Sequence, residues 1–335
     1  MILIDAMYIN NSGGKVLLDY LIKELQKTDK EVFYLLDKRV EGAVPDLTSG
    51  NSQVVYLKAS LLNRHRFYFR NKGKFDSVLC FGGLPPSLKL SARVYTYFHQ
   101  QLYLQFPDTF PVKDRLIFIL KRMVLKFLFR NSDYWMLQTT LIRDNFKKKF
   151  DCDEEKLFLM PFFPRMNKVE NVVRKKNSYV FISKAPPHKN HVRLINAFCE
   201  FFDKHQIGEL TITVDSAFPE LIKMIEERVN LKYPIKNIGF IDRDKLSEVY
   251  QSNEYLIFPS LAESLGLGIA EAIECGCKVI GADLPYMYAV CKPSLVFNPL
   301  DEESILDAFE ESIRGYVQPS ICLVHNKINQ LVELL

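Results

Sequence analysis

The sequence predicts an α/β protein built from two doubly wound domains. Three observations carry this prediction. The chain has 335 residues, which is about two domains at roughly 100–200 residues each. Short apolar runs alternate with helical patterns along most of its length. The alternation breaks at residues 161–177, where Pro161, Pro164 and a charged stretch predict a linker, and then it resumes.

The first half of the chain predicts a sheet of parallel strands with helices on both faces, because its apolar runs are continuous rather than alternating. The predicted strands are Ile2–Asp5, Glu31–Leu36, Gln53–Leu57, Ser77–Phe81, Val94–Phe98 and Tyr134–Gln138. The predicted helices are Lys15–Lys27, which follows a loop with two glycines, and Lys113–Arg130.

The same pattern restarts after the linker. The predicted strands are Tyr179–Ser183, Glu209–Val214, Ile238–Ile241, Tyr255–Phe258 and Lys278–Gly281, and the predicted helices are Asn190–Lys204 and Gly266–Glu274. We therefore expect an N-terminal domain over residues 1–165 and a C-terminal domain over residues 166–315. A helix in residues 316–335 could pack back toward the first domain. Ligands of doubly wound domains bind beyond the carboxyl ends of the strands, so two such domains would share a cleft.

The composition excludes several classes of protein. Hydrophobic residues make up 48% and charged residues 25%, which is ordinary for a folded chain and excludes a disordered or collagenous one. The seven cysteines are scattered, odd in number and without a C-x-x-C motif. We therefore expect buried free thiols in a reducing compartment, and neither a disulfide framework nor a zinc site.

Charge is unevenly divided between the two halves. The formal net charge of +4 hides 26 Lys and Arg against 17 Asp and Glu in residues 1–165, and 18 against 23 in residues 166–335. The first half is therefore at +9 and the second at −5. Such asymmetry suggests that the basic half faces an anionic surface.

The densest chemical pattern follows the predicted strand Tyr255–Phe258. A loop of small residues carries Glu263, a helix starts near Gly266, and Glu271 lies between one and two turns inside it. A helix N-terminus offers free amides and a partial positive charge, which suits a phosphate. Taken alone, the pattern fits an ordinary β-loop-α unit with solvated carboxylates equally well.

The segment at residues 258–280 resembles the E-x7-E signature of glycosyltransferase family 4, whose members have the GT-B fold of two Rossmann-like domains. Glu263 matches the first glutamate and Glu271 the second. The resemblance implies that Glu263 contacts hydroxyls of a donor sugar and that Glu271 accepts hydrogen bonds from the ribose of its nucleotide. It also implies that the loop between them binds the sugar and the diphosphate, through Ser264, Leu265, Gly266 and Leu267.

A second motif opens the C-terminal domain and resembles the family's Gly-Arg-x-x-x-x-Lys-Asn loop. Lys189 falls on the family's lysine, Lys184 falls where arginine is usual, and Ser183 falls where glycine is usual. The resemblance implies that Lys184 and Lys189 neutralise the departing nucleoside diphosphate, which makes Lys189 a candidate catalytic residue. A solvated loop charge is the alternative for either lysine. His188 is expected to be a loop histidine rather than a metal ligand.

Gly13 and Gly14 follow the first predicted strand. Glycines before a helix let the backbone approach a phosphate, and the family carries a glycine pair here, near the donor phosphate and the acceptor. The alternative is a tight turn in which Ser12 caps the helix.

His99 follows the predicted strand Val94–Phe98, where the family often has a histidine close to the reacting sugar. We group His99 with Glu263 and Lys189 as candidate catalytic residues. The family commonly has aspartate next, but Gln100 stands here, so a positioning role is expected rather than acid–base chemistry. A structural hydrogen bond at the strand end is the alternative.

Two basic and apolar segments of the first half are candidates for contact with an anionic membrane. In the helix predicted at residues 113–130, four cations fall within about 80° on a helical wheel: Arg115, Arg122, Lys126 and Arg130. Residues 61–74 combine basic and aromatic side chains. Each such charge contributes about 1 kcal/mol near an anionic bilayer. A core helix with a solvated face is the alternative. No motif indicates nucleic-acid binding.

These features, together with the family resemblance, predict a hexosyltransferase that uses a UDP- or GDP-linked sugar as donor and a glycan or lipid-linked glycan as acceptor, in surface polysaccharide assembly. The resemblance implies that the anomeric configuration is retained. The resemblance implies no metal. Asp242-Arg243-Asp244 has metal-motif spacing but is expected in a loop away from the cleft.

The start of the chain lacks a secretory signal pattern and no run approaches 18 apolar residues. We therefore expect a cytoplasmic protein that could touch the cytosolic face of the inner membrane.

Three alternatives stay open at this point. A glycoside hydrolase would place Glu263 and Glu271 on either side of a glycosidic bond. A non-catalytic binding partner of the same fold would be compatible with Lys184 and Gln100, which depart from the family pattern. A sugar-nucleotide epimerase of the same fold would need no acceptor.

Overall fold

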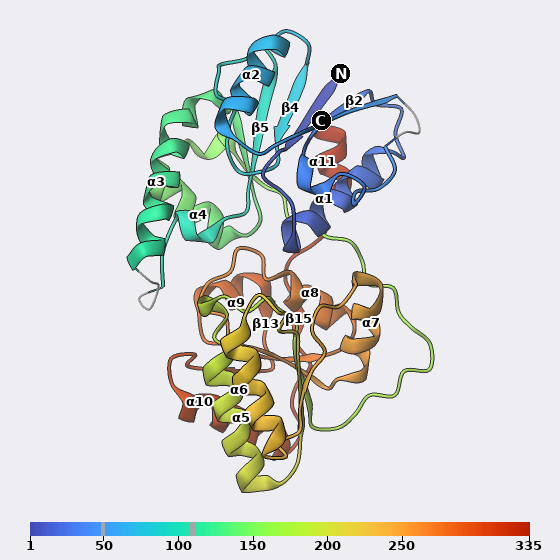
Figure 1. Cartoon of the computed structure of the whole chain (residues 1–335), viewed down its shortest axis with the longest axis vertical. Helices are drawn as coiled ribbons and strands as arrows, with labels where there is room; N and C mark the ends of the chain where they lie inside the picture. Colours follow the sequence, from blue (N-terminus) through green and yellow to red (C-terminus); the bar gives the residue numbers. More distant parts are fainter. Residues whose placement is uncertain (48–50, 108–111) are drawn as a thin grey trace. The chain divides into compact units, whose positions relative to one another are not determined.

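The computed structural model describes residues 1–47, 51–107 and 112–335. They form two compact units (Figure 1). The first holds residues up to Phe106, residues 112–164 and the C-terminal segment His325–Leu335, and the second holds Arg165–Val324. The chain therefore leaves the first unit at residue 164 and returns to it at residue 325.

The described part of the first unit is built on a parallel sheet with the order β3-β2-β1-β4-β5-β6-β7. The strands are β1 (Ile2–Ala6), β2 (Val32–Asp37), β3 (Ser52–Leu57), β4 (Ser77–Cys80), β5 (Arg93–Phe98), β6 (Tyr134–Leu137) and β7 (Leu157–Leu159). Strands β1, β2 and β4 are buried along their whole length, which explains their unbroken apolar runs. Strand β7 is only three residues long and is not among the predicted strands.

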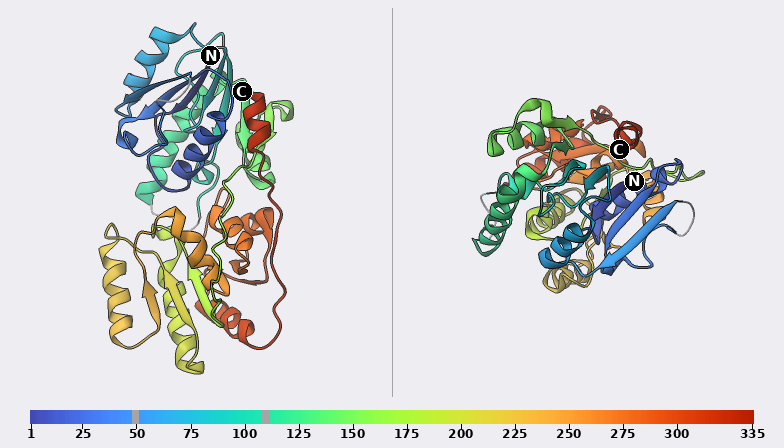
Figure 2. Two further views of the ribbon diagram at one scale, coloured as in Figure 1. Left: turned by 90° about the vertical axis from the view of Figure 1, so that its right-hand side faces the viewer. Right: turned by 90° about the horizontal axis from the view of Figure 1, so that it is seen from above.

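Helices cover both faces of this sheet. Figure 1 shows α2 (Leu61–Asn71), α3 (Val112–Leu128) and α4 (Thr140–Phe150) on one side, and α1 (Ser12–Leu25) with α11 (Ile328–Leu334) on the other. Figure 2 shows the C-terminal helix, in red, lying with the first unit. Short 3-10 turns follow several strands and helices: η1 (Lys38–Val40), η2 (Gln101–Tyr103), η3 (Phe129–Asn131) and η4 (Glu154–Lys156).

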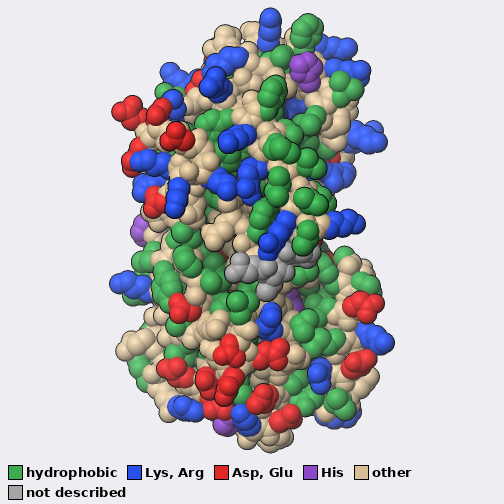
Figure 3. All heavy atoms as spheres, turned by 90° about the vertical axis from the view of Figure 1, so that its left-hand side faces the viewer, with side chains coloured by type: hydrophobic (Ala, Val, Ile, Leu, Met, Phe, Trp, Pro, Cys, Tyr) green, Lys and Arg blue, Asp and Glu red, His purple; other side chains and the backbone are tan. Residues whose placement is uncertain are grey.

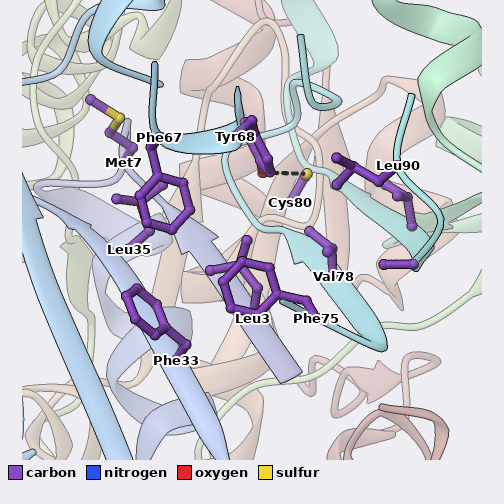
Figure 4. Close-up of a cluster of buried hydrophobic side chains, with 12 residues drawn as sticks. Leu3, Met7, Phe33, Leu35, Phe67, Tyr68, Phe75, Val78, Cys80 and Leu90 are labelled. Carbon is purple, nitrogen blue, oxygen red and sulfur yellow. Dashed lines mark hydrogen bonds between the residues drawn. The ribbon is translucent and has the colours of Figure 1, made fainter. Parts of the chain in front are cut away.

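The core between α2 and the sheet is rich in aromatic side chains (Figure 4). Within it, Phe33 packs on Phe67 and Phe75, with ring centroids 5.6 and 5.5 Å apart. Such pairs add about 0.5–1.5 kcal/mol to the burial of their area. The Phe33–Phe67 contact joins the sheet to α2.

One cation of α2 is buried in this core. Arg64 donates from Nε to Oδ2 of Asp5 at 2.7 Å and from its two terminal nitrogens to the carbonyls of Leu84 and Pro85. Tyr68 donates its hydroxyl to the same carboxylate. Burial opposes the charge of Arg64, but Asp5 and the neighbouring Tyr68, Cys80 and Tyr8 together outweigh it and raise the pKa of Arg64 above its ordinary value. Arg64 therefore belongs to the core and not to the basic surface predicted for residues 61–74.

The described part of the second unit is built on a parallel sheet with the order β10-β9-β8-β11-β12-β14. The strands are β8 (Ser178–Phe181), β9 (Glu209–Ile212), β10 (Ile235–Asn237), β11 (Tyr255–Phe258), β12 (Lys278–Ala282) and β14 (Leu295–Phe297). A small antiparallel pair joins β13 (Cys291–Lys292) to β15 (Ile321–Cys322). The prediction of two doubly wound units is confirmed.

The helices of the second unit fall into two groups. One group packs together through α5 (His191–His205), and its other members are α6 (Pro219–Asn230) and α10 (Glu302–Ile313). In the other, α7 (Arg243–Ser252) packs on α8 (Leu267–Glu274). A short helix α9 (Pro285–Val290) and a 3-10 turn η5 (Pro187–Lys189) complete the unit. At its centre, Tyr179 stacks on Tyr255 and meets Phe309 edge-on.

Three predicted boundaries are wrong. The strand predicted at Ile238–Ile241 lies earlier, at β10. The side-chain amide of Asn237 accepts from the N–H of Val214 and donates to its carbonyl, and Gly239 then turns the chain at φ +62°. Helix α1 begins at Ser12 and takes Gly13 and Gly14 into its first turn. The helix predicted in residues 316–335 is confined to α11.

All seven cysteines are free thiols, six of them buried and Cys322 half-buried. A search of the described residues finds no helix with the length and apolar character needed to cross a bilayer.

Candidate functional site

The loops after β8 and β11 meet in the second unit. The backbone N–H of Leu261 donates to the carbonyl of His188 at 2.7 Å, and the Asn190 side-chain amide donates to the carbonyls of Pro259 and Pro299. Asn190 itself is in the left-handed region, at φ +63°, where η5 passes into α5. Asn190 thereby fastens the lysine-bearing loop to the glutamate-bearing loop at the carboxyl ends of their strands.

Lys189 and Glu263 form an ion pair across these two loops. Both side chains are mostly buried, at 18% and 13% exposure, and Nζ of Lys189 lies 5.9 Å from the ring centre of Phe258. The structure therefore brings together two of the three predicted catalytic residues. Without a ligand, each offsets the charge of the other.

The loop after Glu263 ends in a constrained glycine. Gly266 is the N-cap of α8 and has a φ of +61°. A Cβ at this position would lie 2.9 Å from Cδ1 of Ile269, so glycine is required by both the backbone and the space. No side chain caps α8, whose N-terminal end is formed by Gly266 and Leu267. The partial positive charge of this end faces the loop with Ser264 and Leu265, as an anion site requires.

Glu271 lies in the second turn of α8 and is buried. Its partner is Arg243, the first residue of α7, which donates to Oε1 of Glu271 and also contacts Sδ of Met166. Burial raises the pKa of Glu271 above its ordinary value, although Arg243 acts in the opposite direction. The sequence predicts Asp242-Arg243-Asp244 in a loop away from the cleft. The structure brings Arg243 into contact with one of its predicted residues.

Replacing Arg243 with glutamine should make stability more sensitive to pH. Without the guanidinium, the pKa of Glu271 rises further, and a carboxyl with a raised folded pKa loses stability as the pH rises above its unfolded pKa of about 4.3. We expect the free energy of unfolding to fall by about 1–3 kcal/mol at neutral pH, and by less at pH near 5. Denaturant melts at both pH values measure this.

The double variant Arg243→Gln/Glu271→Gln is the control, because it removes the buried carboxylate with its partner. It should lack the pH-dependent part of the loss. An equal loss at both pH values in the single variant would contradict the ion-pair explanation.

Lys184 lies on the same loop as Lys189 but is exposed. The backbone before it is fixed, because the N–H of Ser183 donates to Oγ1 of Thr213 at 2.9 Å and the Ser183 hydroxyl donates to the carbonyl of Lys184. Serine at this position thus forms a local bond that glycine could not. Lys184 remains a predicted phosphate ligand, presented from an ordered backbone.

Two histidines flank Lys189 and are neutral at physiological pH. Burial lowers the pKa of His188 to about 4, and Lys189 adds to the shift. Burial lowers the pKa of His191 to about 3, and its ring packs on Phe181 with centroids 4.8 Å apart. Neither ring nitrogen of His191 has a hydrogen-bond partner among the described residues.

His191 should make the second unit acid-sensitive. Below its ordinary pKa of about 6.5, the unfolded chain binds a proton that the buried ring does not, so stability falls as the pH falls from about 6.5. We expect the urea concentration at the midpoint of unfolding to fall less for His191→Met than for the parent when the pH is lowered from neutral to near 5. His65→Gln alters a half-buried ring bonded to Ser87 and should keep the parent's acid loss. If His191→Met also keeps it, another group is responsible.

The remaining predicted residues lie together in the first unit. His99 directly follows β5, and its Nε2 lies 3.8 Å from the position that a Cβ on Gly14 would occupy. Its ring packs against both Phe81 and Tyr97, which stack on each other. Burial lowers the pKa of His99 to about 4, so the ring is neutral at physiological pH. Gly13 and Gly14 lie inside α1 rather than before it, and Ser12 is its first residue rather than its cap.

The sequence profile of the family Glycosyl transferases group 1 matches residues 163–313. This range spans β8 to α10 and contains the Lys189–Glu263 and Arg243–Glu271 pairs. Residues 163–313 of this chain are therefore similar to the group 1 glycosyltransferases. The family resemblance predicted from the E-x7-E and lysine loops is thereby confirmed.

One curated protein that this chain resembles is the O-antigen chain mannosyltransferase RfbU of Salmonella typhimurium, which is 24% identical over 202 residues. The match covers 59% of this chain and 55% of RfbU, so the chain spans about half the length of that relative.

Solved structures share the fold over nearly the whole chain. Sucrose-phosphate synthase from Thermosynechococcus elongatus has a TM-score of 0.73 at 16% identity and covers 92% of this chain and 88% of its own. HepE from Anabaena, solved in complex with UDP and glucose, has a TM-score of 0.67 at 13% identity and covers 94% and 90%. The predicted GT-B fold of two Rossmann-like units is confirmed.

Proposed function

We propose that this protein is a glycosyltransferase that moves a hexosyl unit from a UDP- or GDP-linked sugar to a hydroxyl of a glycan or lipid-linked glycan. The observation that carries the proposal is the pairing of Lys189 with Glu263 at the loop before α8, with Glu271 in the second turn of the same helix. One helix end thus has a cation, a carboxylate at the loop and a second carboxylate in the next turn.

The transfer breaks the bond between the anomeric carbon and a phosphate oxygen of the donor. It forms a bond between that carbon and the acceptor oxygen, and the acceptor proton leaves with the nucleoside diphosphate. In the proposed mechanism the new bond forms on the face that the phosphate leaves, so the configuration is retained. Lys184, Lys189 and the N-terminus of α8 would stabilise the charge on the departing diphosphate, and no metal takes part.

Donor binding would rearrange the ion pair of the free protein. Glu263 would turn toward the sugar hydroxyls and Lys189 toward the diphosphate, so that each exchanges its present partner for the ligand. Glu271 would accept from the ribose while it keeps Arg243. In the first unit, His99 and the glycines of α1 would position the sugar and the donor phosphate.

The name of RfbU, an O-antigen chain mannosyltransferase, supports a role in surface polysaccharide assembly with mannose as a candidate sugar. The HepE complexes with UDP and glucose make UDP-glucose the second candidate donor. We therefore propose one of these two sugars.

A panel of nucleotide sugars tests the proposal. A ligand at a hundred times its dissociation constant stabilises the folded protein by about 2.7 kcal/mol, which thermal denaturation detects. We expect GDP-mannose or UDP-glucose to raise the melting temperature without added metal, and to do so less in a Lys189→Gln variant. Incubation of the binding donor with a lipid-linked glycan should then release nucleoside diphosphate in step with sugar transferred.

Two outcomes would contradict the proposal. Release of free sugar from a glycan without any nucleotide donor would indicate a hydrolase. Donor binding with sugar isomerisation and no need for an acceptor would indicate an epimerase.

A further inference from the structure

Helix α3 presents an apolar face to solvent. Phe127 is 86% exposed and Leu120 is 59% exposed, and four further apolar side chains of the helix are also exposed on this side: Val112, Leu116, Ile119 and Met123. On a helical wheel these six residues fall within about 100°. Water-soluble helices normally place charged and polar residues on such a face.

The opposite face of α3 is the one that packs on the unit. Leu125 and Leu128 are buried against the core that includes Trp135 and Phe146, and Phe118 meets Tyr103 edge-on. The helix is therefore apolar on two sides, and only one of them is used by the fold. From the sequence, the alternative to membrane contact is a core helix whose outer face is solvated. The structure shows that its solvent face is itself apolar.

Cations border this apolar face. The helix carries five Lys or Arg and a single acid, Asp114, which is half-buried. Lys113 lies beside the face on one side, and Lys126 and Arg122 lie beside it on the other. Figure 3 shows hydrophobic side chains in a band over this side of the first unit, with Lys and Arg along it.

Three cations of α3 and α4 lie near one another. Lys149 of α4 lies near Arg122 and Lys126, and its pKa is lowered by burial first and then by these two charges. The Arg122 guanidinium lies 5.1 Å from the ring centre of Phe106, and its Nε has no hydrogen-bond partner among the described residues. Such a group of like charges is stabilised by an anion.

We propose that α3 docks the first unit on an anionic lipid bilayer, with the apolar face at residues 112–127 inserted between the headgroups and the bordering cations on lipid phosphates. An apolar stripe bordered by Lys and Arg is the pattern of helices that lie in the membrane interface. A second copy of the chain would bring the same cations against those of the first and be repelled. An anionic bilayer can bury the apolar face and also pair its phosphates with the bordering cations.

Flotation with lipid vesicles tests this proposal without donor or acceptor, so its failure is distinguishable from failure of the proposed sugar transfer. We expect the parent protein to float with vesicles that contain phosphatidylglycerol and much less with pure phosphatidylcholine. Leu120→Gln/Phe127→Gln should lower the partition coefficient at least about tenfold on the anionic vesicles.

Lys113→Gln/Lys126→Gln should lower binding to the anionic vesicles by about fivefold per charge and leave the weak binding to phosphatidylcholine unchanged. Leu231→Gln removes an equally exposed apolar side chain from the second unit and should bind like the parent. Fluorescence of the single tryptophan, which is buried beneath Phe129, reports whether each variant is folded.

Two results would overturn the proposal. One is equal binding of the parent and the Leu120→Gln/Phe127→Gln variant. The other is a dimer, detected by sedimentation, that is lost in this variant while the parent does not bind vesicles.

Discussion

Glu263→Gln is expected to lower the turnover number about a hundredfold or more, while the dissociation constant of the nucleotide sugar changes less than about threefold. Its carboxylate lies at the loop where we propose that the sugar binds, and charge develops on the sugar only as the bond to phosphate breaks. A neutral amide of the same size keeps the contacts of the bound donor. It cannot stabilise the positive charge of the transition state.

Glu271→Gln is the matched variant on the same helix. Because Glu271 is proposed to hold the ribose, we expect about tenfold weaker donor binding and a smaller change in turnover at saturating donor. Initial rates across donor concentrations, together with calorimetric donor binding, separate the two effects. Unchanged turnover and donor affinity in both variants would contradict the site.

Arg64→Leu is expected to lower the free energy of unfolding of the first unit by about 3–5 kcal/mol. Removing the guanidinium leaves the carboxylate of Asp5 buried without its cation, and leaves the carbonyls of Leu84 and Pro85 without a donor. For a unit of this size, the melting temperature of its transition should fall by about 10 °C.

Arg66→Leu is the control for this experiment. Arg66 lies on the same helix but is exposed, so its loss should change stability by less than about 0.5 kcal/mol. Equal losses in the two variants would mean that Arg64 acts through the surface charge of α2 and not through Asp5. Donor binding at the second unit should stay unchanged in both variants.

Local patterns predicted most of the fold. The buried strands β1, β2 and β11 are short, mostly apolar runs. A short apolar run between Gly- and Asn-rich loops predicts a buried strand. Boundaries failed where a single side chain decided them. Ile238–Ile241 is as apolar as a strand, but Asn237 and Gly239 end the strand before it.

The candidate site was predictable only as far as its loops. The glutamates and lysines stand in motifs, but the pairing of Glu271 with Arg243 joins α8 to α7 and depends on how these helices pack. The hydrophobic periodicity of a sequence does not show which two helices will bring such a pair together. The exposed face of α3 was hidden for the opposite reason, since a helix that is apolar on most sides gives no sign of which side the fold will cover.

The return of the chain to the first unit affects the order in which the two units fold during synthesis. Ile328 and Leu331 of α11 are buried, and Asn326 binds Tyr20 and the carbonyl of Phe163 in the first unit. These residues leave the ribosome only after the whole of Arg165–Val324 has been made. The second unit can therefore complete its core first, while the first unit waits with one side of α1 uncovered, in reverse of the usual N-to-C order.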